Sequence, residues 1–348
     1  MSEPVLFSPF QIKSKTLRNR VVLSPMCQYK AENGIVGDWH FQHYSRFAFS
    51  GLGAAFIEAT GVSPEGRIGH GCTGIWNDEQ ISGLSKIVEV FKQYNCVSGI
   101  QLAHAGRKAS FLRPWDGASP IIKYDSKEPA WQTIGPSAVP INDVSPIPKA
   151  MTIEDIDRVK DDFKKAAQRA EKSGFDMIEV HGAHGYLLHS FFSPISNKRT
   201  DKYGGSFENR IRFALEIIGN IKSVWPENKP IFYRLSSVDG VDGGATLDEN
   251  VKLAIALKEA GVDVIDCSSG GISGSPVLTK FKIIPGFQVP YSEKIKNEAN
   301  ISSMAVGAII NATQANDIIL NNRADLVALG RELLADTQWV YKAAKHFN

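Results

Sequence analysis

The stretch TIEDIDRVKDDFKKAAQRAEKSGFDMIEVHGAHGY, residues 152–186, contains a helix pattern, a strand pattern and a polar loop in succession. Thr152 and Asp155 form a capping-box pattern, which predicts a helix start. Apolar residues then recur at helical spacing up to a stop near Gly174, at Val159, Phe163, Ala166 and Ala170. Residues 177–180 follow as a short apolar run, which is typical of a buried strand.

The same helix-and-strand unit recurs along the chain. Further apolar, β-branched runs predict buried strands at residues 21–23, 55–57, 98–100, 231–233, 264–266, 304–306 and 326–329. Amphipathic helices are also predicted at 206–224 and 247–260. Alternating strands and helices predict a parallel sheet, and eight repeats favour a closed (β/α)8 TIM barrel of the α/β class. A doubly wound sheet is disfavoured because no G-x-G-x-x-G follows the first strand.

Two segments depart from this repeat. Residues 103–150 are rich in Pro, Trp, Gly and Ser, and a connection of this length is usually functional. We therefore expect a long loop insertion after strand 3 that caps the barrel mouth, with a surface excursion outside the site as the alternative. Residues 6–19 contain two short extended runs, which predict an N-terminal hairpin across the bottom of the barrel. A single domain is expected over residues 1–348.

Composition excludes several classes of function. The formal net charge is only +2 and the basic residues are scattered, so nucleic acid is not expected as a partner. No window approaches the roughly 18 apolar residues of a membrane helix, and the first residues lack a signal-peptide pattern, so a cytoplasmic location is predicted. The dispersed cysteines form no C-x-x-C pair, which argues against a zinc knuckle or a disulfide scaffold. They are Cys27, Cys72, Cys96 and Cys267.

The carboxyl ends of the strands are where this fold places its active site. The residues of interest just beyond the apolar runs are Ser24, Pro25, Met26, Cys27, Ala59, Gln101, His181, His184, Tyr186, Arg234, Gly307, Gly330 and Arg331. Arg234 ends a buried strand, so its guanidinium needs an anionic or strongly accepting partner. A bound ligand could supply that partner, and so could a carboxylate such as Glu58 or Glu179.

The last two strands end in loops suited to phosphate. Gly330 and Arg331 combine backbone N–H groups with a guanidinium after the eighth strand, and Gly307 follows the seventh. Loops at these positions are a frequent phosphate site in this fold, so a phosphorylated ligand is expected.

His181, His184 and Tyr186 predict a cluster of donors at the end of the fourth strand. Imidazoles can hydrogen-bond a carbonyl oxygen, and a phenol can deliver a proton to a developing carbanion. A metal pair and satisfied core histidines are the alternatives for the two imidazoles.

Longer motifs lie in a characteristic order along nearly the whole chain. They are LRNR at 17–20, SPMCQY at 24–29, IQLAHAGRK at 100–108, HGAHGYL at 181–187, Ser193-Pro194, NKRTDKYGGS at 197–206 and GRELL at 330–334. Together they resemble the old yellow enzyme family, specifically its thermophilic-like branch of ene-reductases and xenobiotic reductases. Any one of these motifs alone would be a weak signal.

This resemblance implies FMN as the cofactor and NADPH or NADH as the hydride donor, with ping-pong kinetics. It implies flavin-ring contacts for Ser24, Pro25, Met26, Cys27, Ala59, Gln101 and Arg234, and phosphate contacts for Gly307, Gly330 and Arg331. Arg234 would stabilise the negative charge of reduced flavin. Cys27 would contact the flavin and modulate its potential.

The resemblance also implies the substrates and their contacts. His181 and His184 would hold the electron-withdrawing oxygen of small enone, maleimide or nitro substrates, and Tyr186 would protonate the α-carbon. Tyr29 would be a second phenol at the substrate. A homodimer or homotetramer is expected. Relatives usually continue into a tail that contributes to the partner subunit's site, whereas this chain stops at Asn348, so either the sequence is trimmed there or that contribution is missing.

Two other functions remain open on the residues alone. A metal-dependent barrel hydrolase would use His181, His184 and a carboxylate such as Glu179 or Asp266, although no further ligand spacing completes its site. A non-enzymatic flavin carrier would use the same donors only to hold a bound molecule, which requires fewer titratable groups than the chain provides.

Overall fold

The computed structural model describes residues 4–121, 128–273 and 283–347. Parallel strands form a closed barrel in the order β10-β11-β12-β3-β4-β5-β8-β9, and the pairing of β12 with β3 closes the ring. The barrel strands are β3 (Val21–Leu23), β4 (Ala54–Gly61), β5 (Val97–Ala103), β8 (Met177–Gly182), β9 (Ile231–Ser236), β10 (Val264–Ser268), β11 (Ser302–Val306) and β12 (Leu326–Leu329). Each predicted run lies within one of them, so the predicted (β/α)8 barrel is confirmed.

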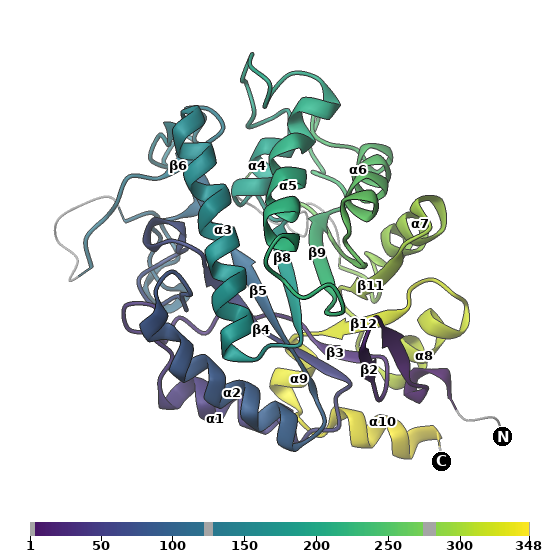
Figure 1. Cartoon of the computed structure of the whole chain (residues 1–348). Coiled ribbons are helices and arrows are strands. Elements are labelled where there is room, and N and C mark those ends of the chain that lie inside the picture. Colours follow the sequence, from purple (N-terminus) through teal and green to yellow (C-terminus); the bar gives the residue numbers. More distant parts are fainter. Residues whose placement is uncertain (1–3, 122–127, 274–282, 348) are drawn as a thin grey trace.

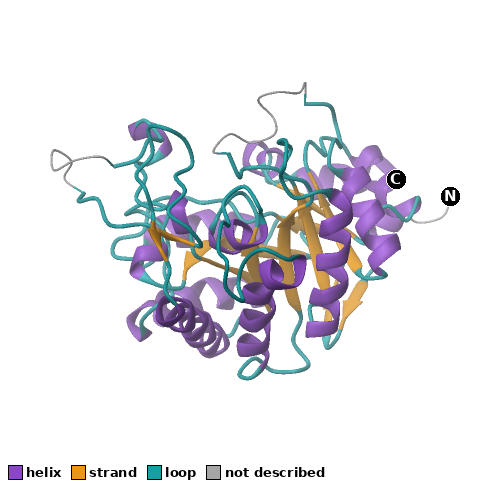
Figure 2. Ribbon diagram, turned by 90° about the horizontal axis from the view of Figure 1, so that it is seen from above, coloured by secondary structure: helices purple, strands orange, loops and turns teal. Residues whose placement is uncertain are grey.

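Helices surround the barrel (Figures 1 and 2). They are α1 (Asp38–Ala48), α2 (Ile81–Gln93), α3 (Ile153–Ser173), α4 (Leu187–Phe192), α5 (Phe207–Lys222), α6 (Leu247–Ala260), α7 (Val289–Ala299), α8 (Ala312–Leu320), α9 (Arg331–Ala335) and α10 (Trp339–Phe347). The predicted capping box is present at α3, where Thr152 Oγ1 accepts from the Asp155 N–H at 3.2 Å. The helix ends at Gly174, whose φ of 89° is the left-handed conformation that glycine adopts easily.

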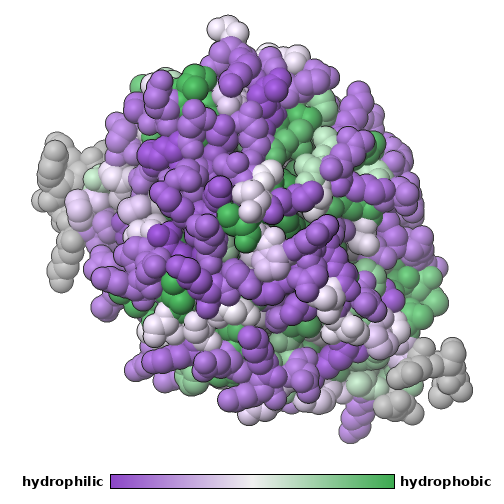
Figure 3. All heavy atoms as spheres, in the orientation of Figure 1, coloured by the Kyte–Doolittle hydropathy of each residue, from purple (hydrophilic) through white to green (hydrophobic). Residues whose placement is uncertain are grey.

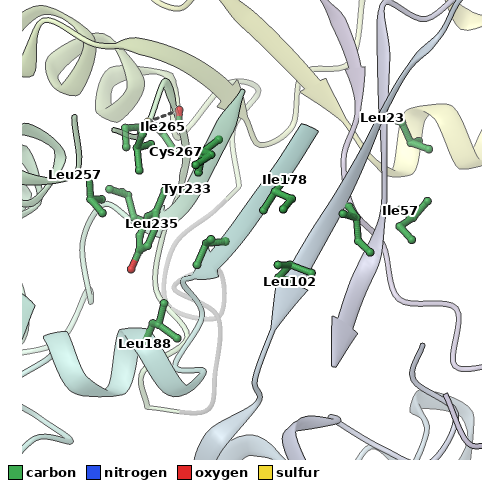
Figure 4. Close-up of a cluster of buried hydrophobic side chains, with 14 of the residues drawn as sticks. Leu23, Ile57, Leu102, Ile178, Leu188, Tyr233, Leu235, Leu257, Ile265 and Cys267 are labelled. Carbon is green, nitrogen blue, oxygen red and sulfur yellow. Dashed lines mark hydrogen bonds between the residues drawn. The ribbon is translucent and has the colours of Figure 1, made fainter. Parts of the chain in front are cut away.

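Alternation along the strands separates two apolar layers. Residues such as Leu23, Ile57 and Ile178 are fully buried and belong to the large cluster between strands and helices. Figure 4 shows part of this cluster, with Leu188 of α4 and Leu257 of α6 packed near the strands. Burying a side chain of this size stabilises the fold by about 1.5–3 kcal/mol.

The second layer fills the bottom of the barrel. Its members alternate with the outer layer along each strand and are Val22, Ala54, Phe56, Met177, Phe232, Val264, Met304, Leu326 and Ala328. The hairpin of β1 (Phe10–Ile12) and β2 (Lys15–Leu17) is antiparallel. Ile12 and Leu17 belong to this same cluster, so the predicted N-terminal hairpin seals the bottom of the barrel.

The insertion after the third barrel strand contains short ordered pieces. They are η4 (Gly106–Lys108), η5 (Pro114–Asp116), β6 (Ile134–Gly135) and β7 (Lys149–Ala150), and residues 122–127 lie outside the described part of the chain. The Arg107 guanidinium ties the insertion together, since it donates to the carbonyl oxygens of Val139 and Pro140 at 3.2 and 3.1 Å. It also donates to the carbonyl of Ile272, beyond β10. The insertion therefore contacts a loop of the barrel mouth, while its capping role stays a prediction.

The face shown in Figure 3 is largely hydrophilic, with hydrophobic residues in scattered groups. Within residues 4–121, 128–273 and 283–347, no helix has both the length and the apolar character needed to cross a membrane.

Candidate active site

Three neighbouring strands change character from the bottom of the barrel to its mouth. Their apolar bottom residues are followed, at every second position, by a charged residue and then by an imidazole or hydroxyl side chain. The series are Met177, Glu179 and His181 on β8, Phe232, Arg234 and Ser236 on β9, and Val264, Asp266 and Ser268 on β10. Since side chains alternate along a strand, all nine project toward the barrel axis.

Arg234 is buried, with 8 % of its surface exposed, and it has a carboxylate partner inside the barrel. Its Nε lies 3.3 Å from Asp266 Oδ2, and its Nη1 donates to Ser24 Oγ at 3.4 Å. The internal carboxylate is thus one of the two partners that the sequence left open, but it is Asp266 and not one of the named examples Glu58 and Glu179, because the adjacent strand β10 places Asp266 directly beside Arg234. Glu179 instead accepts a hydrogen bond from Gln101.

A cavity of about 490 Å³ opens beside Arg234. Its lining includes Ser24, Pro25, Met26, Gly307, Gly330 and Arg331. Gly307 has a φ of 114°, and a Cβ there would lie 2.6 Å from Gln288 Nε2, so this position requires glycine. The cavity thus combines a buried guanidinium, close backbone approach and the exposed Arg331 at the start of α9, which fits an anionic, phosphorylated cofactor.

The predicted contacts do not all line this cavity. Ala59 and Tyr186 line a second, narrow cavity of about 10 Å³ together with Cys72. Cys27 and Gln101 line neither cavity among the described residues. Gln101 donates to Glu179, which projects into the barrel from β8, the neighbour of the strand that carries Arg234, so its predicted flavin contact stays a prediction.

The predicted donor cluster is formed at the end of β8. The ring centroids of His181 and His184 are 5.2 Å apart, and those of His181 and Tyr186 are 4.8 Å apart. His181 Nδ1 accepts from the Ala183 N–H at 3.2 Å, so the proton of its neutral ring lies on Nε2. His184 Nε2 lies 2.7 Å from the hydroxyl oxygen of Ser268.

Electrostatics fix the protonation of this cluster. Burial, followed by the charge of Arg234, holds the pKa values of His181 and His184 well below the usual value, so both rings are neutral near pH 7. Burial raises the pKa of Tyr186 above its ordinary value, so the phenol keeps its proton. Lys108, missed by sequence reasoning, has its Nζ 5.4 Å from the Tyr186 ring centroid. Burial and then Arg107 lower the pKa of Lys108 to about 8.

The loop that holds the cluster is fixed by an unpredicted hydrogen-bond chain. His184 and Gly185 have φ values of 59° and 77°, and a Cβ on Gly185 would collide with the Gly271 carbonyl oxygen. The Gly185 N–H donates to His189 Nδ1 at 2.8 Å, and His189 Nε2 lies 2.7 Å from Asp239 Oδ1. The available sequence signal was the polar pair His189 and Ser190 inside helix α4, whose other residues are apolar.

The loop after β3 brings Cys27 and Tyr29 toward Tyr186. Tyr29 has a φ of 53°, and its phenol hydrogen-bonds the Cys27 thiol. Burial raises the pKa of Cys27, so it remains a thiol. Glu58, also missed as a functional residue, accepts from the Gln28 N–H at 2.8 Å and so anchors this loop from beneath.

These features define a class of protein, a cofactor-dependent oxidoreductase built on a barrel whose mouth provides an anion site beside neutral proton donors. Residues 5–348 match the sequence profile of the NADH:flavin oxidoreductase / NADH oxidase family. The chain belongs to this family, and the predicted old yellow enzyme relationship is confirmed. It is therefore an enzyme with FMN as cofactor and a reduced nicotinamide nucleotide as electron source.

Relatives and solved structures agree with this assignment. An NADPH dehydrogenase of Geobacillus thermodenitrificans (strain NG80-2) is 44% identical over 343 residues, which cover 98% of this chain and 94% of the relative. An NADPH dehydrogenase of Bacillus subtilis (strain 168) is 43% identical over 345 residues, covering 99% and 95%. The structure of morphinone reductase superposes with a TM-score of 0.81 at 26% identity, covering 99% of this chain and 90% of that one.

The metal-dependent hydrolase is not supported by these relatives. The carboxylate that it would need, Glu179 or Asp266, is in either case engaged, with Gln101 or with Arg234 respectively. No group of three or more His, Cys, Asp or Glu side chains that could hold a metal ion occurs in the described part of the chain.

Proposed function

We propose that this enzyme reduces the carbon–carbon double bond of small α,β-unsaturated carbonyl or nitro compounds, with Tyr186 as the proton donor. The observation that carries the proposal is the contact between a neutral imidazole, His181, and a protonated phenol, Tyr186, at one barrel mouth. Morphinone reductase, a structural neighbour, is by its name a reductase of morphinone. A non-enzymatic flavin carrier is not supported, because the relatives are dehydrogenases.

In this proposal, the residues that line the cavity of about 490 Å³ bind FMN. Gly307, Gly330 and Arg331 would hold the phosphate of FMN, and Ser24, Pro25 and Met26 would line its ring. Arg234 would face the pyrimidine edge of the ring, where a guanidinium stabilises negative charge. When bound and reduced, FMN supplies the hydride.

The other side of the mouth handles the substrate. His181 Nε2–H and the His184 ring would donate to the electron-withdrawing oxygen, which draws electron density from the alkene and prepares its β-carbon for hydride. Neutral imidazoles suit this role because the substrate oxygen needs a hydrogen-bond donor, and a neutral ring still has one N–H group. Tyr186 would give its proton to the α-carbon, so the alkene gains one hydride and one proton. Tyr29 would add a second phenol at the substrate.

The wider setting stays a proposal as well. We infer a homodimer or homotetramer in the cytoplasm, and enones, maleimides or nitro compounds as substrates, from the same family resemblance. The insertion at 103–150 would shape the entrance, since Lys108 within it donates to the backbone carbonyls of His184 and Gly271 at 2.8 and 3.2 Å.

The central experiment follows the flavin absorption of the purified protein under anaerobic conditions. NADPH is expected to bleach the yellow protein, and cyclohexenone is then expected to restore its colour. Bleaching without restoration would contradict the proposed alkene reduction while leaving the NADPH reaction intact.

A variant test addresses His181 directly. His181→Ala should weaken binding of a phenol ligand about 10-fold or more, because a hydrogen bond worth roughly 1–2 kcal/mol is lost. The measurement is titration of the long-wavelength charge-transfer band, with His346→Ala, an exposed histidine on α10, as the matched control. Unchanged phenol affinity in His181→Ala would show that the assignment is wrong.

A further inference from the structure

Four polar side chains cross the barrel just below the mouth, and the proposed mechanism gives a role only to Arg234. They are Gln101 on β5, Glu179 on β8, Arg234 on β9 and Asp266 on β10. Gln101 lies opposite Glu179 in the β5–β8 register, and Asp266 lies opposite Arg234 in the β9–β10 register. Glu179 and Asp266 are both completely buried, so neither carboxyl group can be satisfied by bulk water.

The contacts form a nearly continuous path. Gln101 Nε2–H donates to Glu179 Oε1 at 2.7 Å, and Arg234 Nε lies 3.3 Å from Asp266 Oδ2. The Glu179 and Asp266 carboxyl groups lie within hydrogen-bonding reach of each other. Yet Glu179 Oε2 and both Asp266 oxygens receive no hydrogen bond from any N–H or O–H donor in the described residues.

A single proton resolves this arrangement. Two ionised carboxylates in contact without solvent would repel each other, and one arginine can neutralise only one of them. A proton on Glu179 Oε2 removes the repulsion and satisfies an oxygen of each carboxyl group. Burial, and then the charge of Asp266, raise the pKa of Glu179, which is consistent with this assignment.

We propose that Glu179 holds a proton and donates it in a hydrogen bond to Asp266, so that Gln101, Glu179, Asp266 and Arg234 form one chain that positions Gln101 and Arg234 at the flavin. The inference rests on the proposed function only in placing Arg234 beside the cofactor, and on the family resemblance in placing Gln101 there. Glu179 and Asp266 are then positioning residues, and the chain is neutral overall, with Asp266 balancing Arg234. With Glu179 ionised, the chain would instead carry a net negative charge beneath a cofactor that becomes negative on reduction.

The substitution Glu179→Gln separates the two charge states. Glutamine matches the protonated acid in shape, because its oxygen can accept from Gln101 and its NH2 group can donate to Asp266. If Glu179 is protonated, the substitution leaves the net charge unchanged. If Glu179 is ionised, the substitution removes a negative charge near the flavin.

The first measurement is the midpoint potential of the bound flavin, obtained by reductive titration with dithionite and a reference dye. Glu179→Gln should match the wild-type potential and bind FMN to the apoprotein within about twofold of wild type. Asp266→Asn is the matched control and should raise the potential, because it removes the negative charge that opposes Arg234. A rise in Glu179→Gln similar to that in Asp266→Asn would overturn the proposal.

A second measurement does not depend on how the Glu179 variant folds. Infrared spectroscopy should detect the C=O stretch of a protonated carboxylic acid in the folded enzyme. A Glu58→Gln background removes the contribution of the other buried glutamate with a raised pKa. The band should persist in that background and disappear on adding Glu179→Gln, and its absence from the Glu58→Gln enzyme would overturn the proposal.

These outcomes are independent of alkene reduction. An enzyme that passes both tests but leaves cyclohexenone unreduced would refute the proposed function and keep the proton chain. An enzyme that reduces cyclohexenone but shows a raised potential in Glu179→Gln would refute the proton chain alone.

Discussion

The bottom and the mouth of the barrel are built from the same strands, but apolar packing holds the bottom together and polar contacts hold the mouth together. At the bottom, Met177, Phe232 and Val264 fill space, and the hairpin closes the cluster with Ile12 and Leu17. Two positions further along each strand the side chains are charged, and at the mouth they hydrogen-bond loops. Apolar residues that fill space can be replaced by other apolar residues of similar volume. In a hydrogen-bonded layer, by contrast, the loss of one residue leaves its buried partner without a hydrogen bond. Residues that stabilise the fold and residues that take part in the chemistry therefore lie at different heights along the barrel axis.

The largest expected effect is on chemistry at the mouth. Tyr186→Phe removes the proton donor, so the alkene half-reaction should slow by about 10²–10⁴-fold, the usual contribution of general acid catalysis. Bleaching by NADPH should change little, because that step requires no proton from Tyr186. Anaerobic stopped-flow measurement of the two half-reactions separates these effects.

The matched control is Tyr341→Phe, which alters a tyrosine that is 54 % exposed on α10. It should leave both half-reactions unchanged. An alkene half-reaction in Tyr186→Phe as fast as in wild type would remove Tyr186 from the mechanism and weaken the division between bottom and mouth.

The bottom layer should show the opposite profile. Phe232→Ala leaves a cavity next to Phe56, whose ring centroid is 5.2 Å away, and should lower the free energy of unfolding by about 3–5 kcal/mol. Urea unfolding of the apoprotein measures this loss, with the exposed Phe41→Ala expected to change stability by less than about 0.5 kcal/mol. The flavin potential of Phe232→Ala should equal that of wild type, and a shifted potential would show that the two layers are coupled.

A smaller effect is expected from Glu58, which anchors the loop of Cys27 and Tyr29. Burial raises the pKa of Glu58 from 4.5 to about 7 in the folded protein. The folded state therefore keeps a proton that the unfolded chain loses, so this group's contribution to stability is full below pH 4.5 and falls as the pH rises toward 7. The loss is at most about 3 kcal/mol.

Glu58→Gln should abolish that decline. The measurement is the free energy of unfolding of both proteins across this pH range, taken as a difference. His40 and His43 titrate with the opposite sign, since burial lowers their pKa values to about 4. His43 is present in both proteins and cancels in the difference, whereas His40 Nε2 lies 3.4 Å from Glu58 Oε1, so the difference measures Glu58 together with this contact. Parallel pH profiles for wild type and Glu58→Gln would show that Glu58 ionises normally in the fold.

The sequence predicted the strands and helices, because these follow from local periodicity. It could not predict the contacts that form only when the strands pair into the closed barrel. Strand runs and the capping box at Thr152 are local patterns, so the barrel and α3 followed from them. The sequence left the partner of Arg234 open because strand pairing decides it, and the choice of Asp266 needs the β9–β10 register. Alternation along Met177, Glu179 and His181 did contain the signal that Glu179 faces inward.

The candidate site was predicted as a set of residues, without its supports. His181, His184 and Tyr186 are close in sequence, so their convergence could be foreseen. His189 and Asp239 lie 50 residues apart, and their contact exists only once α4 docks beside the loop after β9. The separation of Ala59 from the large cavity likewise depends on side-chain packing that no spacing rule contains.

The pairing of β12 with β3 has a consequence for biosynthesis. β3 is the first barrel strand to be made and β12 is the last of the eight, so β3 has one unpaired edge until β12 has been made. The hydrogen bond from the Leu6 N–H to Asn316 Oδ1 also forms only after the C-terminal part of the barrel has been made. Nascent chains that stall before β12 would therefore expose an unpaired strand edge that can pair with neighbouring chains, and the docking of β12 ends this exposure.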